Sequence, residues 1–504
     1  MRSCAHVVAC VATAGVLSGC LRDTSHPCES AGACNDLDAA RPDGGADGGE
    51  AGDGAVHDDA PGIDATVDNP WGDGHHGDLT ISIAQAQING YGVIRQDAAA
   101  GATLVAVQHR DGATVGSWPD NFEPGDRVMI WRTAGLAAPI TSGTTTPLVL
   151  DGDVGRWYVT RVVERMTDRL TLADALPFAC PANQAQIIKL PELDTVTVNA
   201  ASEVFAEDWQ GEYGGLVGFY ANELVLDTGV ISAGSDGFNG GDPEDFGDFS
   251  NCTALDGRSP SGGGAAKGES LVPSRYGIGV SLASGRGNIY SGGGGGNCRN
   301  GGGGGGALGG GGGVGGNDLD ARPFGGMPGV PVIFAPPTHL TMGGGGGAGE
   351  NNATTSGFGG YGGGVVWLTV RTVRCLGGGA IAASGNDGAG APNEGGGGGG
   401  GGGFIYIRAE TITGCSLRAV GGDGASTGNT HGPGGGGGGG RIVLVTDAMT
   451  GVTTNVSGGS AGDPGLGAAA GQGGTVCGNG ALEPGETCDD GNHRPGDACT
   501  TCSE

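Results

Sequence analysis

Glycine is the feature that most restricts how this chain can fold, because it makes up 117 of the 504 residues. The longest uninterrupted runs cover residues 395–403 and 434–440, and further glycine-rich stretches lie at 292–313 and 343–347. Glycine brings no side chain to a core and loses much conformational entropy on folding. It can nevertheless form extended threefold helices, which bundle closely because, as in collagen, only glycine fits between their axes. We expect such a bundle, with flexible loops as the alternative.

A repeat of apolar strands surrounds these runs between residues 214 and 474. Each copy contains strand segments separated by a short break, and the first three copies end in an Asp-Gly turn. The copies start at residues 216, 365, 404 and 441, and the last has the character of a terminal cap. Units that cannot bury an apolar face alone become stable by stacking. Residues 201–474 are therefore predicted to form a β-solenoid or stacked sandwich with polyglycine insertions, and we leave open whether residues 330–334 form a degenerate copy.

Residues 78–200 have a different pattern, in which short apolar runs alternate with turn residues. Runs at 104–107, 127–131 and 157–163 favour strands, and no segment shows sustained helical periodicity. We predict a small antiparallel barrel or sandwich, which makes the whole chain all-β. The stretch from Gly125 to Val198 resembles an N-terminal module of secreted glycine-rich proteins in myxobacteria. That resemblance implies location more than activity.

The N-terminus has the features of an export signal. Arg2 precedes an apolar stretch, residues 5–17, that is too short to span a bilayer. Leu17-Ser18-Gly19-Cys20 resembles the bacterial lipobox, which implies cleavage before Cys20, acylation of that cysteine and attachment to a lipid membrane. An ordinary signal peptide is the alternative. We expect residues 1–20 to be the signal and the mature chain to be lipid-anchored at the cell surface, in the outer membrane of the envelope.

Residues 21–77 are rich in Asp, Gly and Ala and nearly free of large apolar residues, so we interpret them as an acidic disordered tether. His75 and His76 within it could bind a metal, but two histidines without fixed partners are a weak site. The formal net charge of the chain is -30. That charge argues against nucleic acid as a partner, since phosphate binding needs clustered Lys and Arg.

The C-terminal residues 475–504 contain the elements Cys-Gly-Asn-Gly, Glu-Pro-Gly-Glu and Cys-Asp-Asp-Gly-Asn. They resemble the cysteine-rich repeat found at the ends of myxobacterial secreted proteins, and so short a module needs disulfides or metal to stay folded. Eleven of the 14 cysteines follow Cys20, so at least one should lack an intramolecular partner. Zinc binding by the cysteines is a weaker alternative to disulfides, because their spacing lacks the paired Cys-x-x-Cys motifs of a zinc ribbon. The disulfide candidates are Cys477, Cys488, Cys499, Cys502, Cys28 and Cys34.

Two sets of oxygen-bearing side chains are candidate calcium ligands. The C-terminal set is Asp489, Asp490, Asn492 and Asp497. The second set, Asp236, Asp387 and Asp423, occupies equivalent places in three repeats and would approach one edge if the repeats stack. The alternative for the second set is a turn that needs Asp-Gly for a positive φ. We assign no cofactor beyond this candidate Ca²⁺.

No catalytic motif with defensible context occurs, since the formal nucleophile-elbow match at residues 458–462 is expected by chance in glycine-rich sequence. The glycine-rich region resembles glycine-rich domains of receptor tyrosine kinase ectodomains and the polyglycine-helix tips of phage adhesins, which implies a display scaffold. We predict a non-catalytic adhesin or recognition protein that binds glycans, matrix or cells. A structural envelope component is the first alternative, and a β-helix carbohydrate-active enzyme is the second. Candidate stacking residues are Trp209, Tyr213, Tyr220, Tyr361 and Trp367.

Overall fold

The computed structural model describes residues 69–478, apart from short gaps at 111–121, 137–139, 141, 244–251, 257–263, 273–282, 318–321, 336–337, 352–356, 391–392, 428–430 and 464–465. All regular elements in this part are β-strands, which confirms the all-β prediction. The same residues contain no apolar helix of membrane-spanning length.

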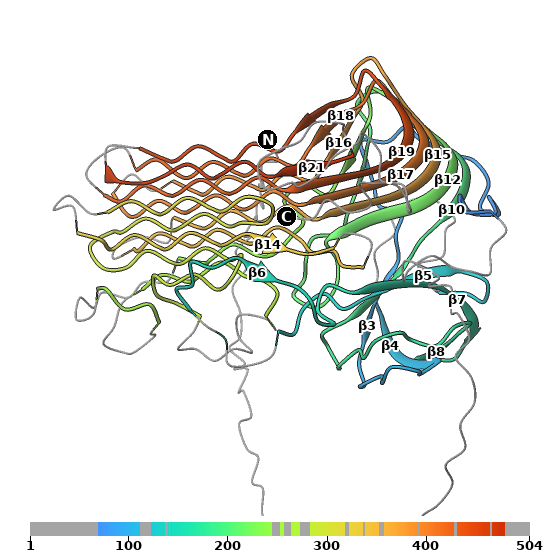
Figure 1. The fold of residues 1–504 in the computed structure, drawn as a ribbon, viewed down its shortest axis with the longest axis horizontal. Coiled ribbons are helices and arrows are strands. Elements are labelled where there is room, and N and C mark those ends of the chain that lie inside the picture. The colour runs from blue at the N-terminus through green and yellow to red at the C-terminus, as the bar shows by residue number, and fades with distance from the viewer. Residues whose placement is uncertain are drawn as a thin grey trace, which may run out of the picture. The chain divides into compact units, whose positions relative to one another are not determined.

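Two parallel sheets form a solenoid (Figure 1). The seven-stranded sheet has the order β1 (Leu79–Ile81), β10 (Glu192–Val198), β12 (Leu216–Asp227), β15 (Val365–Leu376), β17 (Phe404–Thr413), β19 (Arg441–Thr450) and β21 (Thr475–Cys477). The six-stranded sheet has the order β2 (Gln85–Ala86), β11 (Glu203–Phe205), β13 (Val230–Ser232), β16 (Ala380–Ala382), β18 (Ser416–Arg418) and β20 (Thr453–Asn455). From β10 to β20, one long and one short strand make each rung, and all pairs are parallel, so the solenoid is the alternative that the chain adopts.

The core of the solenoid lies between the two sheets, where the same kind of side chain recurs at the same register from rung to rung. Ile231 pairs with Ile381, and Ile381 pairs with Leu417, all fully buried. On the long strands, Leu368 pairs with Ile407 in the same way. Each rung alone would expose these apolar side chains to water, so stacking supplies the burial that stabilises the fold.

An antiparallel barrel is inserted in the chain between β2 and β10. Its closed order is β3 (Tyr91–Ile94), β4 (Leu104–Arg110), β8 (Arg169–Leu172), β7 (Trp157–Arg165), β5 (Arg127–Trp131) and β9 (Gln186–Lys189). The predicted β-rich segment 78–200 therefore contains the barrel together with β1, β2 and β10, which belong to the solenoid. The parallel pairing of β1 with β10 spans the whole inserted barrel.

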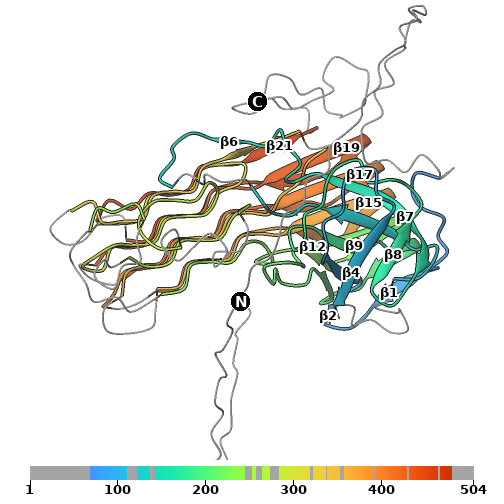
Figure 2. The same cartoon turned by 90° about the horizontal axis from the view of Figure 1, so that it is seen from below.

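The outer surface of the barrel packs against the seven-stranded sheet (Figure 2). Trp131 and Trp157 of the barrel share one buried apolar cluster with Tyr220 and Trp367 of the sheet. The ring centroids of Trp157 and Trp367 lie 5.6 Å apart in an edge-on arrangement. This contact covers aromatic side chains that the sheet would otherwise present to solvent.

Two sequence interpretations change in the structure. Residues 330–334 do not form a degenerate rung, because β14 (Val332–Ile333) pairs with β6 (Leu148–Val149) from a connection of the barrel. The end of the proposed tether is also ordered, since His76 donates its N–H to the Glu192 carbonyl at 3.0 Å and Asp194 donates to Gly77 at 2.9 Å. Gly74 and Gly77 have φ values of 69° and 70°, so a tight left-handed loop holds the histidines against β10.

Candidate functional site

The glycine runs form an ordered bundle of extended helices that continue from the strands of the solenoid (Figure 1). Within the nine-glycine run, residues three apart donate their N–H groups to the same neighbouring segment. Residues 398 and 401 bond to 347 and 344, residues 399 and 402 bond to 435 and 438, and residues 397, 400 and 403 bond to 389, 386 and 383. Period three is the signature of a threefold helix, so the bundle replaces the alternative of flexible loops.

Close packing, and not backbone conformation, requires glycine inside this bundle. None of residues 395–403 has a positive φ, so the backbone conformation itself does not call for glycine. A Cβ added at Gly398 would lie 2.1 Å from the Gly304 carbonyl oxygen, and one added at Gly400 would lie 1.9 Å from the Tyr361 carbonyl oxygen. Any side chain at these positions would push a neighbouring helix away and break its hydrogen bonds.

Residues 357–363 form a helix at the surface of the bundle, and every third position of it faces solvent. Phe358 and Tyr361 are 44% and 45% exposed, whereas the glycines between them are buried. Residues 359 and 362 bond to the segment 238–241, and residues 360 and 363 bond to 398 and 401. Two of the three helix faces are therefore occupied by neighbours. The third face carries two aromatic side chains in line.

A polar row lies directly beside this aromatic pair. Asn386 donates its backbone N–H to the Tyr361 carbonyl at 2.8 Å, which places the exposed Asn386 and Asp387 alongside the ring-bearing helix. Asp387 Oδ1 accepts the N–H of Asp423 at 2.7 Å, and Asp423 Oδ1 accepts the N–H of Ser460 at 2.6 Å. We call the set Phe358, Tyr361, Asn386, Asp387, Asp423 and Ser460 the outer face.

The three repeat aspartates do not share one environment. Asp387 and Asp423 are exposed and join successive rungs as just described, whereas Asp236 is buried. The glycines that follow them have no positive φ, so the positive-φ turn explanation is wrong. Gly388 is needed for close packing instead, because a Cβ there would lie 2.0 Å from the Gly397 carbonyl oxygen. The groups of potential metal ligands found among the described residues include none of these aspartates.

Those groups of potential ligands are His75, His76 and Asp126, and Asp73, His75 and Glu192. They lie where the loop before β1 meets the barrel and β10. Asp126 Oδ2 lies 2.8 Å from Lys189 Nζ, and the Glu192 backbone N–H donates to His76 Nδ1 at 3.2 Å. Burial, His75 and Lys189 lower the pKa of His76.

Cations already neutralise the most buried carboxylate of this cluster. Glu192 is fully buried and pairs with Arg127 at 3.0 Å and with Arg161 at 2.7 Å. The Arg127 guanidinium carbon also lies 4.0 Å from the centre of the Tyr220 ring. Because two guanidinium groups would repel a metal ion held by Glu192, we interpret the cluster as an ion-pair network that joins the barrel to the solenoid.

The predicted stacking aromatics separate clearly in the structure. Trp209, Tyr220 and Trp367 are buried, Tyr213 is half-buried, and Tyr361 is exposed. Phe358, which sequence reasoning missed, is exposed beside it. The signal was available in the sequence, where Gly-Phe-Gly-Gly-Tyr-Gly-Gly places aromatic residues at the period of a threefold helix.

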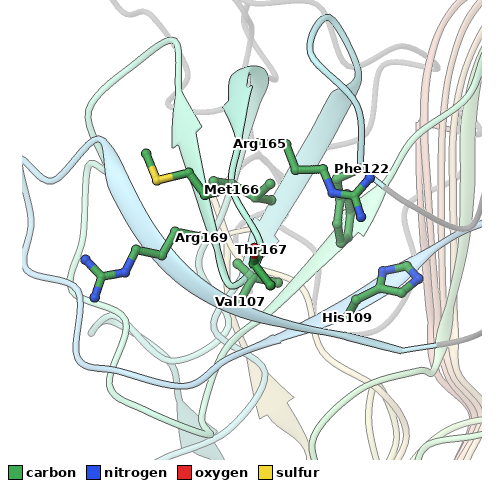
Figure 3. Close-up of a pocket in the computed structure, with 8 residues that line it drawn as sticks. Val107, His109, Phe122, Arg165, Met166, Thr167 and Arg169 are labelled. Carbon is green, nitrogen blue, oxygen red and sulfur yellow. The ribbon is translucent and has the colours of Figure 1, made fainter.

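A small hollow at one end of the barrel is the alternative candidate (Figure 3). Its lining includes Val107, His109, Phe122 and Arg165. His109, Phe122 and Arg165 lie on one side of the hollow, and Arg169 extends away from that side. Its volume of about 30 Å³ has room for about two or three water molecules, because a cavity of about 10–15 Å³ holds one. This hollow is too small for a sugar ring or a cofactor.

Disulfides lie at two places that the sequence did not single out. Cys375 and Cys415 join successive rungs, and Cys252 and Cys298 join two segments of the bundle region. Cys180 is free and buried in the part of the chain that the structure describes. Cys477 at the end of β21 is disulfide-bonded.

The following predicted residues lie outside the described ranges: Cys20, Cys28, Cys34, Cys488, Asp489, Asp490, Asn492, Asp497, Cys499 and Cys502.

Comparison with known proteins adds little to this geometry. No family model matches the chain, and no curated protein matches it. Among solved structures, the tailspike protein gp49 from Pseudomonas phage LKA1 matches with 8% sequence identity and a TM-score of 0.13. The match covers 75% of this chain and 66% of the tailspike chain, just under two thirds of its length.

Proposed function

We propose that this protein is a non-catalytic recognition protein of the cell surface, whose outer face binds glycans. The exposed in-line pair of Phe358 and Tyr361 supports this function most directly. Aromatic rings on a protein surface offer flat apolar faces for the C–H faces of sugar rings. Carboxylate and amide oxygens next to them accept hydrogen bonds from hydroxyl groups. Asp387 and Asn386 supply such oxygens beside the pair.

The scaffold suits recognition because it is rigid before the ligand arrives. Residues 357–363 are hydrogen-bonded to neighbouring helices through their glycines, so the two rings project from a fixed backbone. A ligand that meets a preorganised surface does not have to order the backbone on binding. We propose further that acylation of Cys20 attaches the chain to the lipid of the outer membrane.

The test compares a double variant, Phe358→Ala with Tyr361→Ala, with a matched control, Val163→Ala with Leu376→Ala. The control removes two apolar side chains that are 56% and 42% exposed on other parts of the surface. Labelled mature protein is titrated onto bacterial cells and purified exopolysaccharide, with and without EDTA. We expect saturable binding that weakens at least tenfold in the double variant and not in the control, since each stacked ring contributes about 1 kcal/mol.

Other outcomes would favour the alternatives. Absence of saturable binding by folded protein would support a structural envelope component. Release of new reducing ends from the polysaccharide would support a carbohydrate-active enzyme. Loss of binding in EDTA that calcium restores would support the predicted calcium sites, whereas binding unaffected by EDTA would contradict a role for calcium in recognition.

A further inference from the structure

We infer that the ligand of the outer face is a linear, uncharged polysaccharide that lies along the axis of the 357–363 helix. This inference rests on the proposed function and adds the class of glycan and its orientation. Two observations on the outer face carry it. The first is the spacing of the two rings, and the second is the charge of the polar row beside them.

The spacing follows from the helix that carries the rings. A threefold extended helix rises about 3.1 Å per residue, so positions 358 and 361 lie about 9 Å apart along one line of the surface. A single pyranose ring cannot reach both aromatic faces, whereas linked rings of one chain can. Once one sugar ring has stacked on one aromatic side chain, the stacking of a second sugar ring on the other side chain is intramolecular. The affinity therefore rises without a new kind of contact.

The glycines between the rings keep the path open. Gly359 and Gly360 are buried, and they have no side chain that would rise between Phe358 and Tyr361. The segment 383–389 runs antiparallel beside this helix, with Ala389 bonded to Phe358 and Asn386 bonded to Tyr361. Ligand hydroxyl groups along one edge of a bound chain would therefore meet the polar row. This arrangement favours a ligand parallel to the helix axis over one that crosses it.

The charge of the outer face argues against acidic polymers. Asp387 and Asp423 are exposed, and each uses one oxygen to accept a backbone N–H. None of the six outer-face residues is Lys or Arg, and the chain as a whole has a net charge of -30. Carboxylates accept hydrogen bonds from neutral hydroxyls but repel uronate and sulfate groups. We therefore expect the face to select against polyanions.

The test titrates β-1,4-linked glucose and N-acetylglucosamine oligosaccharides of one to six units into the full mature chain by calorimetry. We expect weak binding of monosaccharides and at least a tenfold gain in affinity when the oligosaccharide is long enough to contact both rings, followed by a plateau. Phe358→Ala and Tyr361→Ala should each remove that gain and leave the weak binding. Affinity that does not depend on length would overturn the inference.

Charge selection is tested separately with alginate as the polyanion. Wild-type protein should bind alginate at least tenfold more weakly than a neutral glucan, and Asp387→Asn with Asp423→Asn should narrow this difference. Asparagine keeps the side-chain oxygen that accepts the neighbouring N–H, so the fold should be unaffected. Preference for alginate would overturn the inference, as would self-association of the protein that the double aromatic variant abolishes.

The two proposals fail in different ways. If the protein binds cells and purified exopolysaccharide through Phe358 and Tyr361 but binds none of the neutral oligosaccharides, glycan recognition stands and this inference is wrong. If the aromatic variants change binding to neither cells nor any polysaccharide, both proposals are wrong.

Discussion

Replacing Gly400 by alanine should be among the most destabilising single changes in the polyglycine bundle. The added Cβ would lie 1.9 Å from the Tyr361 carbonyl oxygen, whereas ordinary contact begins at 3.4 Å, so the neighbouring helix must move by about 1.5 Å. That helix also donates two hydrogen bonds to the same run, from Gly360 to the Gly398 carbonyl at 2.8 Å and from Gly363 to the Gly401 carbonyl at 2.8 Å. A displacement of that size would weaken both hydrogen bonds in the interior of the bundle.

The cost can be worked from these contacts. Overpacking costs about 1–3 kcal/mol, and each buried backbone group left without a partner costs about 1–3 kcal/mol. With two hydrogen bonds affected, we expect the free energy of unfolding to fall by roughly 3–9 kcal/mol. Because Tyr361 belongs to the displaced helix, Gly400→Ala should also weaken polysaccharide binding.

Gly473 provides the matched control within the same bundle. A Cβ there would meet nothing closer than the Val456 carbonyl oxygen at 3.9 Å, which is ordinary contact, and Gly473 has no positive φ. Urea unfolding followed by tryptophan fluorescence, with hydrogen exchange of residues 395–403, measures both variants. Gly473→Ala should lie within about 0.5 kcal/mol of wild type. Equal stability of the two variants would refute the close-packed bundle.

Further predictions concern the disulfide and two buried carboxylates. Cys375→Ser should lower the free energy of unfolding by roughly 4 kcal/mol, because the bond to Cys415 closes a loop with a sequence separation of 40; a urea midpoint equal to that of wild type would contradict this. Burial raises the pKa of Glu269 from 4.5 to about 7, so its stabilising contribution is complete below pH 4.5 and is lost as pH rises through 7. In Glu269→Gln, the fall in stability between pH 4.5 and 8 should be about 3 kcal/mol smaller than in wild type, and identical pH profiles would show that Glu269 is not the group responsible. Glu192→Gln should cost about 3–5 kcal/mol by leaving Arg127 without its buried counter-ion, as chemical denaturation would measure, and a loss below 1 kcal/mol would mean that solvent replaces the pair.

The sequence was sufficient for those features that depend on local chemistry. Uninterrupted glycine excluded a side-chain core along residues 395–403 and left the threefold helix as the ordered conformation. The recurring strands at residues 365, 404 and 441 predicted rungs because each needs a neighbour to bury its apolar face. The 78–200 segment predicted strands and turns, and the choice between barrel and sandwich required the structure.

Features that depend on distant partners appeared only in the tertiary structure. Tyr220 and Trp367 read as candidate binding residues, yet the inserted barrel buries them. The repeat pattern in the sequence predicts that Asp387 and Asp423 are equivalent to Asp236. In the structure Asp236 is buried and the other two are exposed, because burial depends on neighbouring segments of the bundle.

The outer face shows both contributions in one place. The three-residue spacing of Phe358 and Tyr361 is a property of the sequence, because a threefold helix places every third residue on one side. Which side faces solvent was decided by tertiary packing, since segments 238–241 and 398–401 occupy the other two faces. Periodicity fixes which side chains share a face, and only the packing of chain segments far apart in sequence fixes which face remains open.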